Sequence, residues 1–379
     1  MDRRRFLART SFFVVAASAL SACGGGDDEP TGRYQFPQGV ASGDPRESSL
    51  VFWSRCVRAD GSAGDVPVRL QVSKSTRFDT LLADVALTAS ATYDFTVRAK
   101  VTGLPSATPL YYRFVAGNDF SAVGTGKTAP AAGATVPQLR FAWFTCQDWS
   151  VNHWAAMNLL AAESDLDFIV HLGDYIYETV GAAFQSGAAE PAHPRISLPN
   201  GTKLADGTVY ATTLADYRTL YRTYRGDARL QALHAKFALI ATWDDHEFSD
   251  DCWQDHQTYT NENKQETARR RAASQAWLEY MPVDFGDMSF DSANAAYTNL
   301  RIYRDFKFGN LAHLVMTDQR LYRDDHLVPE AVIAQAQGHD PINGGDSIGS
   351  RYFVQQPVLA QFEALKTQAL GRTPSMLGT

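Results

Sequence analysis

The spacing of hydrophobic residues changes at about residue 130, and this change limits the folds open to the chain. Before it, short alternating segments such as 68–72 and 110–114 are separated by Gly, Pro, Asp and Ser. This pattern is typical of an all-β sandwich of the fibronectin or immunoglobulin kind. Residues 127–137, with two prolines and several small residues, form the expected linker. We therefore predict a β-sandwich domain at 34–131 and a second domain at 137–379.

The second domain begins with a strand, a helix and another strand. Residues 139–144 and 166–172 are hydrophobic runs, and the segment between them at 152–162 has helical spacing. Such a βαβ unit makes its strands parallel and buries them on both faces. Residues 236–242 and 311–317 are two further candidate strands. We predict an α/β domain whose sheets are flanked by helices.

Three other segments carry weaker predictions. Residues 213–224 and 267–280 are predicted to be surface helices, and the three arginines at 269–271 are interpreted as a solvated face rather than a phosphate clamp. Residues 181–209 are rich in Gly, Ala and Pro without clear periodicity, which predicts a long insertion loop. Long loops in compact domains are often lids over a site.

The N-terminus has the features of an export signal. Residues 3–7 read Arg-Arg-Arg-Phe-Leu and precede an apolar stretch at 12–20, which is shorter than the ~20 residues that span a bilayer. The arginines resemble a Tat leader, and Leu-Ser-Ala before Cys23 resembles a lipobox whose cysteine is acylated. The alternative is an ordinary cleaved leader. Either interpretation predicts passage through the Tat machinery to a periplasmic, extracellular or membrane-anchored location.

The overall charge bears on the class of partner. The chain carries a net charge of −7, with 45% hydrophobic residues. Proteins that hold nucleic acid use basic patches that neutralise phosphates, so this composition argues against a standing nucleic-acid partner. Cys56, Cys146 and Cys252 remain after the leader, and an odd number outside the cytoplasm indicates that at least one is unpaired or binds a ligand.

Polar residues cluster directly after each predicted strand of the second domain. Because functional groups in α/β sheets collect at the carboxyl ends of strands, these clusters predict one cleft. The four clusters begin at Cys146, Asp174, Asp244 and Asp318.

The residue types in these clusters favour metal chemistry. A thiolate at Cys146, a carboxylate at Asp174 and a phenolate at Tyr177 are three anionic donors, and phenolate suits ferric iron. Asp245 is a candidate ligand for a second metal, His246 a candidate acid or hydrogen-bond donor, and Asp244 a candidate partner that orients His246. The alternatives are a helix N-cap for Asp174, a packed aromatic for Tyr177 and a solvated acidic loop for the later run.

Together these motifs resemble the PhoD-type alkaline phosphatase/phosphodiesterase family. The resemblance rests on the leader and on four sequence runs: 36–45, Cys146-Gln147, 171–178 (His-Leu-Gly-Asp-Tyr-Ile-Tyr-Glu) and 243–247 (Trp-Asp-Asp-His-Glu). It implies a metallophosphoesterase fold similar to that of calcineurin-like and purple acid phosphatases.

The resemblance also implies a ligand set. Cys146, Asp174 and Tyr177 would hold Fe³⁺, Asp174 and Asp245 would contribute to Ca²⁺, and His246 would face the substrate phosphate. Arg320 lies in the family's Asp-x-Arg-x-Tyr-Arg pattern. Two roles are open for Arg320: an ion pair with Asp318 or a contact with the substrate phosphate.

The expected activity is hydrolysis of small phosphate esters or phosphodiester polymers by a metal-activated water. The family pattern continues beyond residues 375–379 into a Gly-Asp-x-His motif that completes the metal site, so we expect this chain alone to under-coordinate its metals. The alternative is a non-catalytic exported binding protein or an inactive truncated remnant. A zinc hydrolase is a weaker prediction, because His-x-x-x-His is absent from the sequence.

Overall fold

The computed structural model describes residues 12–16, 34–151, 153–185, 190–259, 263–284, 286, 289–291, 293–327 and 356–374. The arginines of the predicted leader and Cys23 lie outside these ranges. β1 (Phe12–Ala16) pairs in parallel with β8 (Thr96–Thr102). None of the helices described is long and apolar enough to cross a bilayer.

The N-terminal part consists of two facing β layers. One contains β3 (Val40–Gly43), β4 (Ser49–Arg55) and β8, and the other contains β6 (Val66–Ser73), β7 (Leu81–Ala89), β9 (Pro109–Ala116), β10 (Asp119–Phe120) and β11 (Gly124–Lys127). Alternation along each strand directs one set of side chains into a shared core. Leu50 and Phe52 point into this core, whereas Trp53 points to the opposite face.

The second part supplies parallel strands to the same sheet. β12 (Phe141–Phe144), β13 (Phe168–His171) and β17 (Leu239–Ala241) are parallel, and the full order is β1-β8-β4-β3-β17-β13-β12. β3 joins β17 in parallel where Gly43 lies opposite Leu239. A Cβ at Gly43 would lie 2.2 Å from the carbonyl oxygen of Pro282, so only glycine fits there. The sheet therefore continues across the predicted linker at 127–137.

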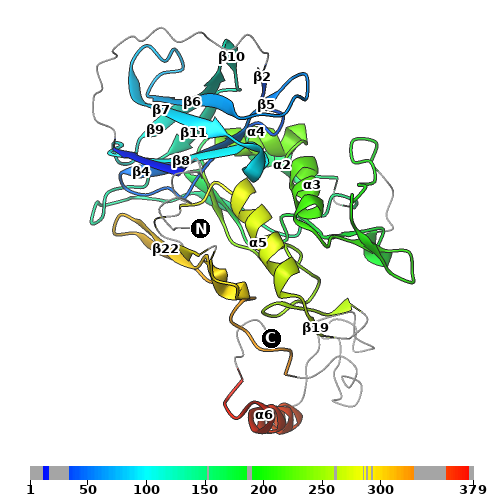
Figure 1. The fold of residues 1–379 in the computed structure, drawn as a ribbon. Coiled ribbons are helices and arrows are strands. Elements are labelled where there is room, and N and C mark those ends of the chain that lie inside the picture. Colours follow the sequence, from blue (N-terminus) through cyan, green and yellow to red (C-terminus); the bar gives the residue numbers. More distant parts are fainter. Residues whose placement is uncertain are drawn as a thin grey trace.

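The described part of the chain contains five α-helices, four of which lie beside the sheets (Figure 1). They are α2 (Ala155–Ala162), α3 (Leu214–Tyr224), α4 (Ala228–Lys236), α5 (Thr267–Tyr280) and α6 (Gln356–Leu370). Thr213 and Asp216 form a capping box that starts α3, and the Asp227 side chain caps α4. α6 lies apart from the strands, and none of its residues is buried.

The remaining strands are short. β2 (Tyr34–Gln35) pairs with β5 (Val57–Arg58), β18 (His256–Gln257) with β19 (Lys264–Gln265), and β20 (Ser289–Phe290) with β21 (Leu300–Arg301). β14 (Thr179–Val180), β15 (Thr202–Lys203) and β16 (Val209–Tyr210) form a small sheet. The predicted insertion loop at 181–209 thus contains some regular structure.

The prediction that the arginines of α5 form a solvated face is wrong. Arg269 and Arg270 are buried, because α5 packs into the core through Ala273 and Trp277. The Arg269 guanidinium donates to the carbonyl oxygens of Ala211 and Phe248, and Arg270 lies over the rings of Trp243 and Phe248. Burial of an arginine is tolerated where its donors meet carbonyls and its plane meets aromatic rings.

The fourth predicted strand of the second domain lies in a different layer. β22 (Arg304–Phe308) and β23 (Ala312–Met316) form an antiparallel hairpin outside the main sheet. Phe306, Phe308 and Met316 pack against Phe168 and Val170 of β13. The hairpin covers one face of the sheet instead of extending its edge.

A buried ion pair joins three distant parts of the chain. Asp44, directly after β3, receives two hydrogen bonds from Arg304 of β22, at 2.9 Å from Nε and 2.7 Å from Nη2. Both side chains are at most 1% exposed. Arg304 also donates to the carbonyl of Ala241 at the end of β17, and Asp44 accepts the backbone N–H of Asp284. This pair fixes the hairpin relative to the sheet.

We expect Arg304→Met to reduce the free energy of unfolding by about 3–5 kcal/mol, because it leaves the Asp44 carboxylate buried without its partner. The matched control is Arg69→Met, which removes the exposed pair with Asp84 on β6 and β7 and should cost about 1 kcal/mol or less. Urea unfolding of both variants measures the difference. Equal losses would contradict a special role for the Asp44–Arg304 pair.

Candidate metal centre

The loops after β12, β13 and β17 meet at one edge of the sheet, as the sequence predicts. These strands are parallel, so their carboxyl ends lie side by side. The N–H of Cys146 donates to the carbonyl of Gly173 at 3.3 Å, and that of Gln147 donates to the carbonyl of Asp174 at 3.1 Å. The first two clusters are therefore held together by their own backbones.

Glu247 ties the second cluster to the third. Its buried carboxylate accepts the backbone N–H groups of Asp174 at 3.1 Å, Tyr175 at 2.7 Å and Asp244 at 2.8 Å. The loops approach so closely that a Cβ at Gly173 would lie 2.3 Å from the Asp244 nitrogen. Gly173 also has a φ of +116°, which disfavours any other residue.

Cys146 and Tyr177 converge on the carboxylate of Asp174. The Cys146 sulfur lies 3.3 Å and the Tyr177 hydroxyl 3.4 Å from Asp174 Oδ2. Cys146 and Asp174 both adopt positive φ, of 57° and 56°, a conformation that is uncommon for residues with a side chain. The structure thus brings together the three residues predicted to bind iron.

Burial and neighbouring negative charge dominate the protonation of this group and outweigh the positive charge of His246. Burial and the neighbouring Asp245 raise the pKa of Asp174 to about 8. Burial likewise raises the pKa of the Cys146 thiol and, together with the Asp174 charge, that of Tyr177. All three groups would be ionised more readily beside a cation.

Asp244 and Asp245 extend the acidic cluster on the β17 side. Oxygens of Asp174, Asp244 and Asp245 all lie within 4.8 Å of one another, a spacing that suits a bound cation. Arg320 pairs with Asp244 at 2.6 Å and with Asp245 at 3.1 Å. Of the two alternatives left open for Arg320, the structure does not form the ion pair with Asp318: the Arg320 group that donates to Asp318 is the backbone N–H, at 3.0 Å.

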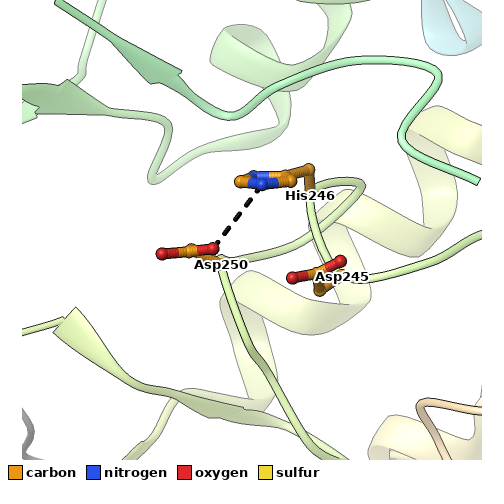
Figure 2. Close-up of side chains that lie close together, drawn as sticks. All are labelled: Asp245, His246 and Asp250. Atoms are coloured by element: carbon orange, nitrogen blue, oxygen red, sulfur yellow. Dashed lines mark ion pairs between the residues drawn. The ribbon is translucent and has the colours of Figure 1, made fainter. Parts of the chain in front are cut away.

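His246 is oriented by Glu178. Its Nδ1 lies 2.7 Å from Oε2 of the fully buried Glu178, whereas the predicted partner Asp244 is paired with Arg320. The other ring nitrogen, Nε2, lies 3.5 Å from Asp250, and Figure 2 shows Asp245, His246 and Asp250 gathered in the loop after β17. Burial disfavours charge on the imidazole, but the Glu178 carboxylate outweighs it and raises the pKa of His246 well above its usual value.

The donor set fits the two kinds of metal that the sequence implies. The Cys146 thiol, the Tyr177 phenol and the Asp174 carboxyl group meet at Asp174 Oδ2, and these donor types match the preferences of ferric iron. The oxygens of Asp174, Asp244 and Asp245 match the preferences of calcium. Asp245, His246 and Asp250 form a second group within 4.8 Å that overlaps the first. The buried carboxylates outnumber the arginine that faces them, which leaves negative charge for a cation to neutralise.

Comparisons with known proteins identify the family of the chain. Residues 141–372 match the PhoD-like phosphatase family, and residues 19–130 match the N-terminal domain of PhoD-like phosphatases. The chain belongs to the PhoD-like phosphatase family.

Two relatives define how much of a PhoD-like protein this chain represents. It is 33% identical to alkaline phosphatase D of Bacillus subtilis (strain 168) over 342 residues, which cover 86% of this chain and 54% of the relative. A solved structure of PhoD superposes with a TM-score of 0.64 at 32% identity, and the match covers 82% of this chain and 55% of that one. The chain therefore spans about half the length of these relatives.

Sequence reasoning left three residues of this PhoD-like site without a role. Glu178 and Glu247 stood inside recognised motifs, and their function in orienting other groups depends on contacts across loops that spacing does not reveal. Asp250 lies just beyond the recognised motif, and burial raises its pKa to about 7. The one available signal was distance from a predicted strand end: Glu178 and Glu247 lie within six residues of the ends at 172 and 242, and Asp250 lies eight residues beyond the second.

The raised pKa of Asp174 predicts a pH dependence for the metal-free PhoD-like chain. Above pH ~4 the unfolded carboxyl is ionised, while Asp174 in the fold keeps its proton up to about pH 8. Stability should therefore fall as pH rises across this window, by up to about 1.4 kcal/mol per pH unit from this group.

Urea unfolding in EDTA at several pH values measures this slope. Asp174→Asn, which cannot ionise, should flatten it, and Ca²⁺ should offset it in the unaltered protein. An unchanged slope in Asp174→Asn would contradict the assignment.

Proposed function

We propose that this chain forms a metal site of an exported phosphoesterase that hydrolyses phosphate monoesters, diesters or both. The observation that carries the proposal is the convergence of Cys146 and Tyr177 on one oxygen of Asp174, beside Asp245. Membership of the PhoD-like phosphatase family supports the same class of reaction.

The proposed metals are Fe³⁺ and Ca²⁺. Cys146, Asp174 and Tyr177 would hold iron, while Asp174 and Asp245 would contribute to calcium. When bound, these cations would neutralise charge on the phosphate and lower the pKa of the attacking water. Thiolate and phenolate donors favour iron over calcium at the first position.

The chain's own residues would orient and protonate the substrate. Glu178 accepts a hydrogen bond from Nδ1 of His246, which directs Nε2 away from Glu178 and keeps the imidazole charged. A charged His246 can donate a hydrogen bond to a phosphoryl oxygen or a proton to the leaving group. Asp250, 3.5 Å from Nε2, would yield that position to the substrate.

Export and domain class complete the proposal. The arginines at 3–5 and the Cys23 motif support passage through the Tat machinery and a lipid anchor at Cys23. The two facing layers around Leu50 and Phe52 support an immunoglobulin- or fibronectin-like class for the N-terminal domain. The phosphoesterase part would then have the calcineurin-like fold.

Colour is the first test of the iron site. Protein loaded with Fe³⁺ should show a visible charge-transfer band, because tyrosinate and thiolate donate charge to ferric iron. Tyr177→Phe should weaken or shift this band, whereas Tyr303→Phe, at an exposed tyrosine, should leave it unchanged. A colourless iron-loaded protein would contradict the assignment.

Activity is the second test. The metal-loaded protein is assayed with p-nitrophenyl phosphate and its bis-ester, and Asp174→Ala should lower hydrolysis at least about a hundredfold, the scale of losing a charge-stabilising group. Full activity in Asp174→Ala would contradict the mechanism. Tight metal binding without hydrolysis of either ester would favour the alternative of a non-catalytic binding protein.

A further inference from the structure

Arg320 is held in a fixed position by its own backbone. Its N–H donates to Asp318 Oδ1 at 3.0 Å, and its carbonyl accepts the N–H of Gln254 at 2.9 Å. Asp318 Oδ1 also accepts the indole N–H of Trp243, at 3.1 Å. The backbone of Arg320 is therefore held next to the end of β17. Arg320 is 76 residues away in the sequence from Asp244, which follows this strand.

The guanidinium spans three groups of the β17 loop. Nε lies 2.6 Å from Asp244 Oδ1, Nη2 lies 3.1 Å from Asp245 Oδ1, and Nη1 donates to the carbonyl of Cys252 at 3.1 Å. The other oxygen of Asp245 accepts the N–H of Asp251 at 2.7 Å. Each oxygen of Asp245 thus faces a nitrogen: Oδ1 pairs with Arg320, and Oδ2 accepts the N–H of Asp251.

Two effects of Arg320 on a bound cation oppose each other. The positive charge of Arg320 repels a metal ion. The Asp244 carboxylate lies closer to Arg320 than the Asp245 carboxylate does, and so it offsets more of this charge. Without Arg320, two adjacent carboxylates would be left close together and largely buried, and one would turn away or take up a proton. The partners that orient metal ligands typically contribute 10–100-fold in metal affinity, so orientation should dominate.

We propose that Arg320 is a positioning residue of the metal centre, whose planar fork holds Asp245 in the orientation that a cation needs. This inference rests on the metal site of the proposed function. A lysine could keep the charge but not the fork, because an ammonium is a point charge that cannot span both carboxylates and the Cys252 carbonyl.

The test is titration of the metal-free chain with Tb³⁺, a luminescent substitute for Ca²⁺, with Ca²⁺ competition as a check. Arg320→Gln and Arg320→Lys should both bind Tb³⁺ about 10–100-fold more weakly than the unaltered protein. The luminescence lifetime should report about one additional bound water, because a displaced Asp245 vacates a coordination position. A purely structural role would not change this water count.

Arg218→Gln is the matched control. Arg218 makes a similar two-pronged pair with Glu279, at 2.6 and 2.7 Å and with comparable burial, but on α3 and α5. Its loss should leave Tb³⁺ affinity and water count unchanged, and circular dichroism checks the folding of each variant.

Three outcomes overturn the inference. Unchanged or tighter Tb³⁺ binding by Arg320→Gln, with the same water count, would show that Arg320 does not position Asp245. If Arg320→Lys binds Tb³⁺ as tightly as the unaltered protein, the positive charge of Arg320 matters and its planar fork does not. If the unaltered chain fails to bind Tb³⁺, the calcium site of the proposed function fails as well, which distinguishes that failure from the first two.

Discussion

The site depends on a single buried carboxylate that receives three backbone N–H groups. Glu247 collects the N–H groups of Asp174, Tyr175 and Asp244, and so joins the loops after β13 and β17. These loops would otherwise present unpaired donors at strand ends, and burying such donors is costly. With the loops locked together, Asp174 is held in a left-handed conformation that places its carboxylate between Cys146 and Asp245. Both predicted metal positions thus follow from one hydrogen-bonded junction.

Much of this geometry follows from the sequence because parallel strands end at the same edge. The hydrophobic runs at 139–144, 166–172 and 236–242 gave three of the strands, and the first residues after them are the ones that meet. The hairpin of β22 and β23 could not be recognised in this way, since a hydrophobic run does not reveal whether its strand extends a sheet or covers its face. Arg320 nevertheless reaches the site, from a second layer.

Arg320 and His246 pair with residues that are distant in the sequence, and for the same physical reason. Long side chains pair with groups that are close in space. These groups are often far apart in the sequence, so sequence neighbours are a poor guide to the pairing. Arg320 bypasses the adjacent Asp318 for Asp244, and Asp318 is occupied by backbone N–H groups and an indole. His246 likewise takes Glu178 from the β13 loop. Glu178 and Arg320 therefore orient the residues that carry the proposed chemistry.

Anomalous X-ray diffraction tests most directly whether Asp174 lies between two cations. Crystals of the protein loaded with Fe³⁺ and Ca²⁺ should show an iron peak, identified by data on both sides of the iron absorption edge. This peak should lie within bonding distance of Cys146, Asp174 and Tyr177, with a second, non-iron peak beside Asp245. An iron peak elsewhere, or none at Asp174 in iron-loaded crystals, would contradict it.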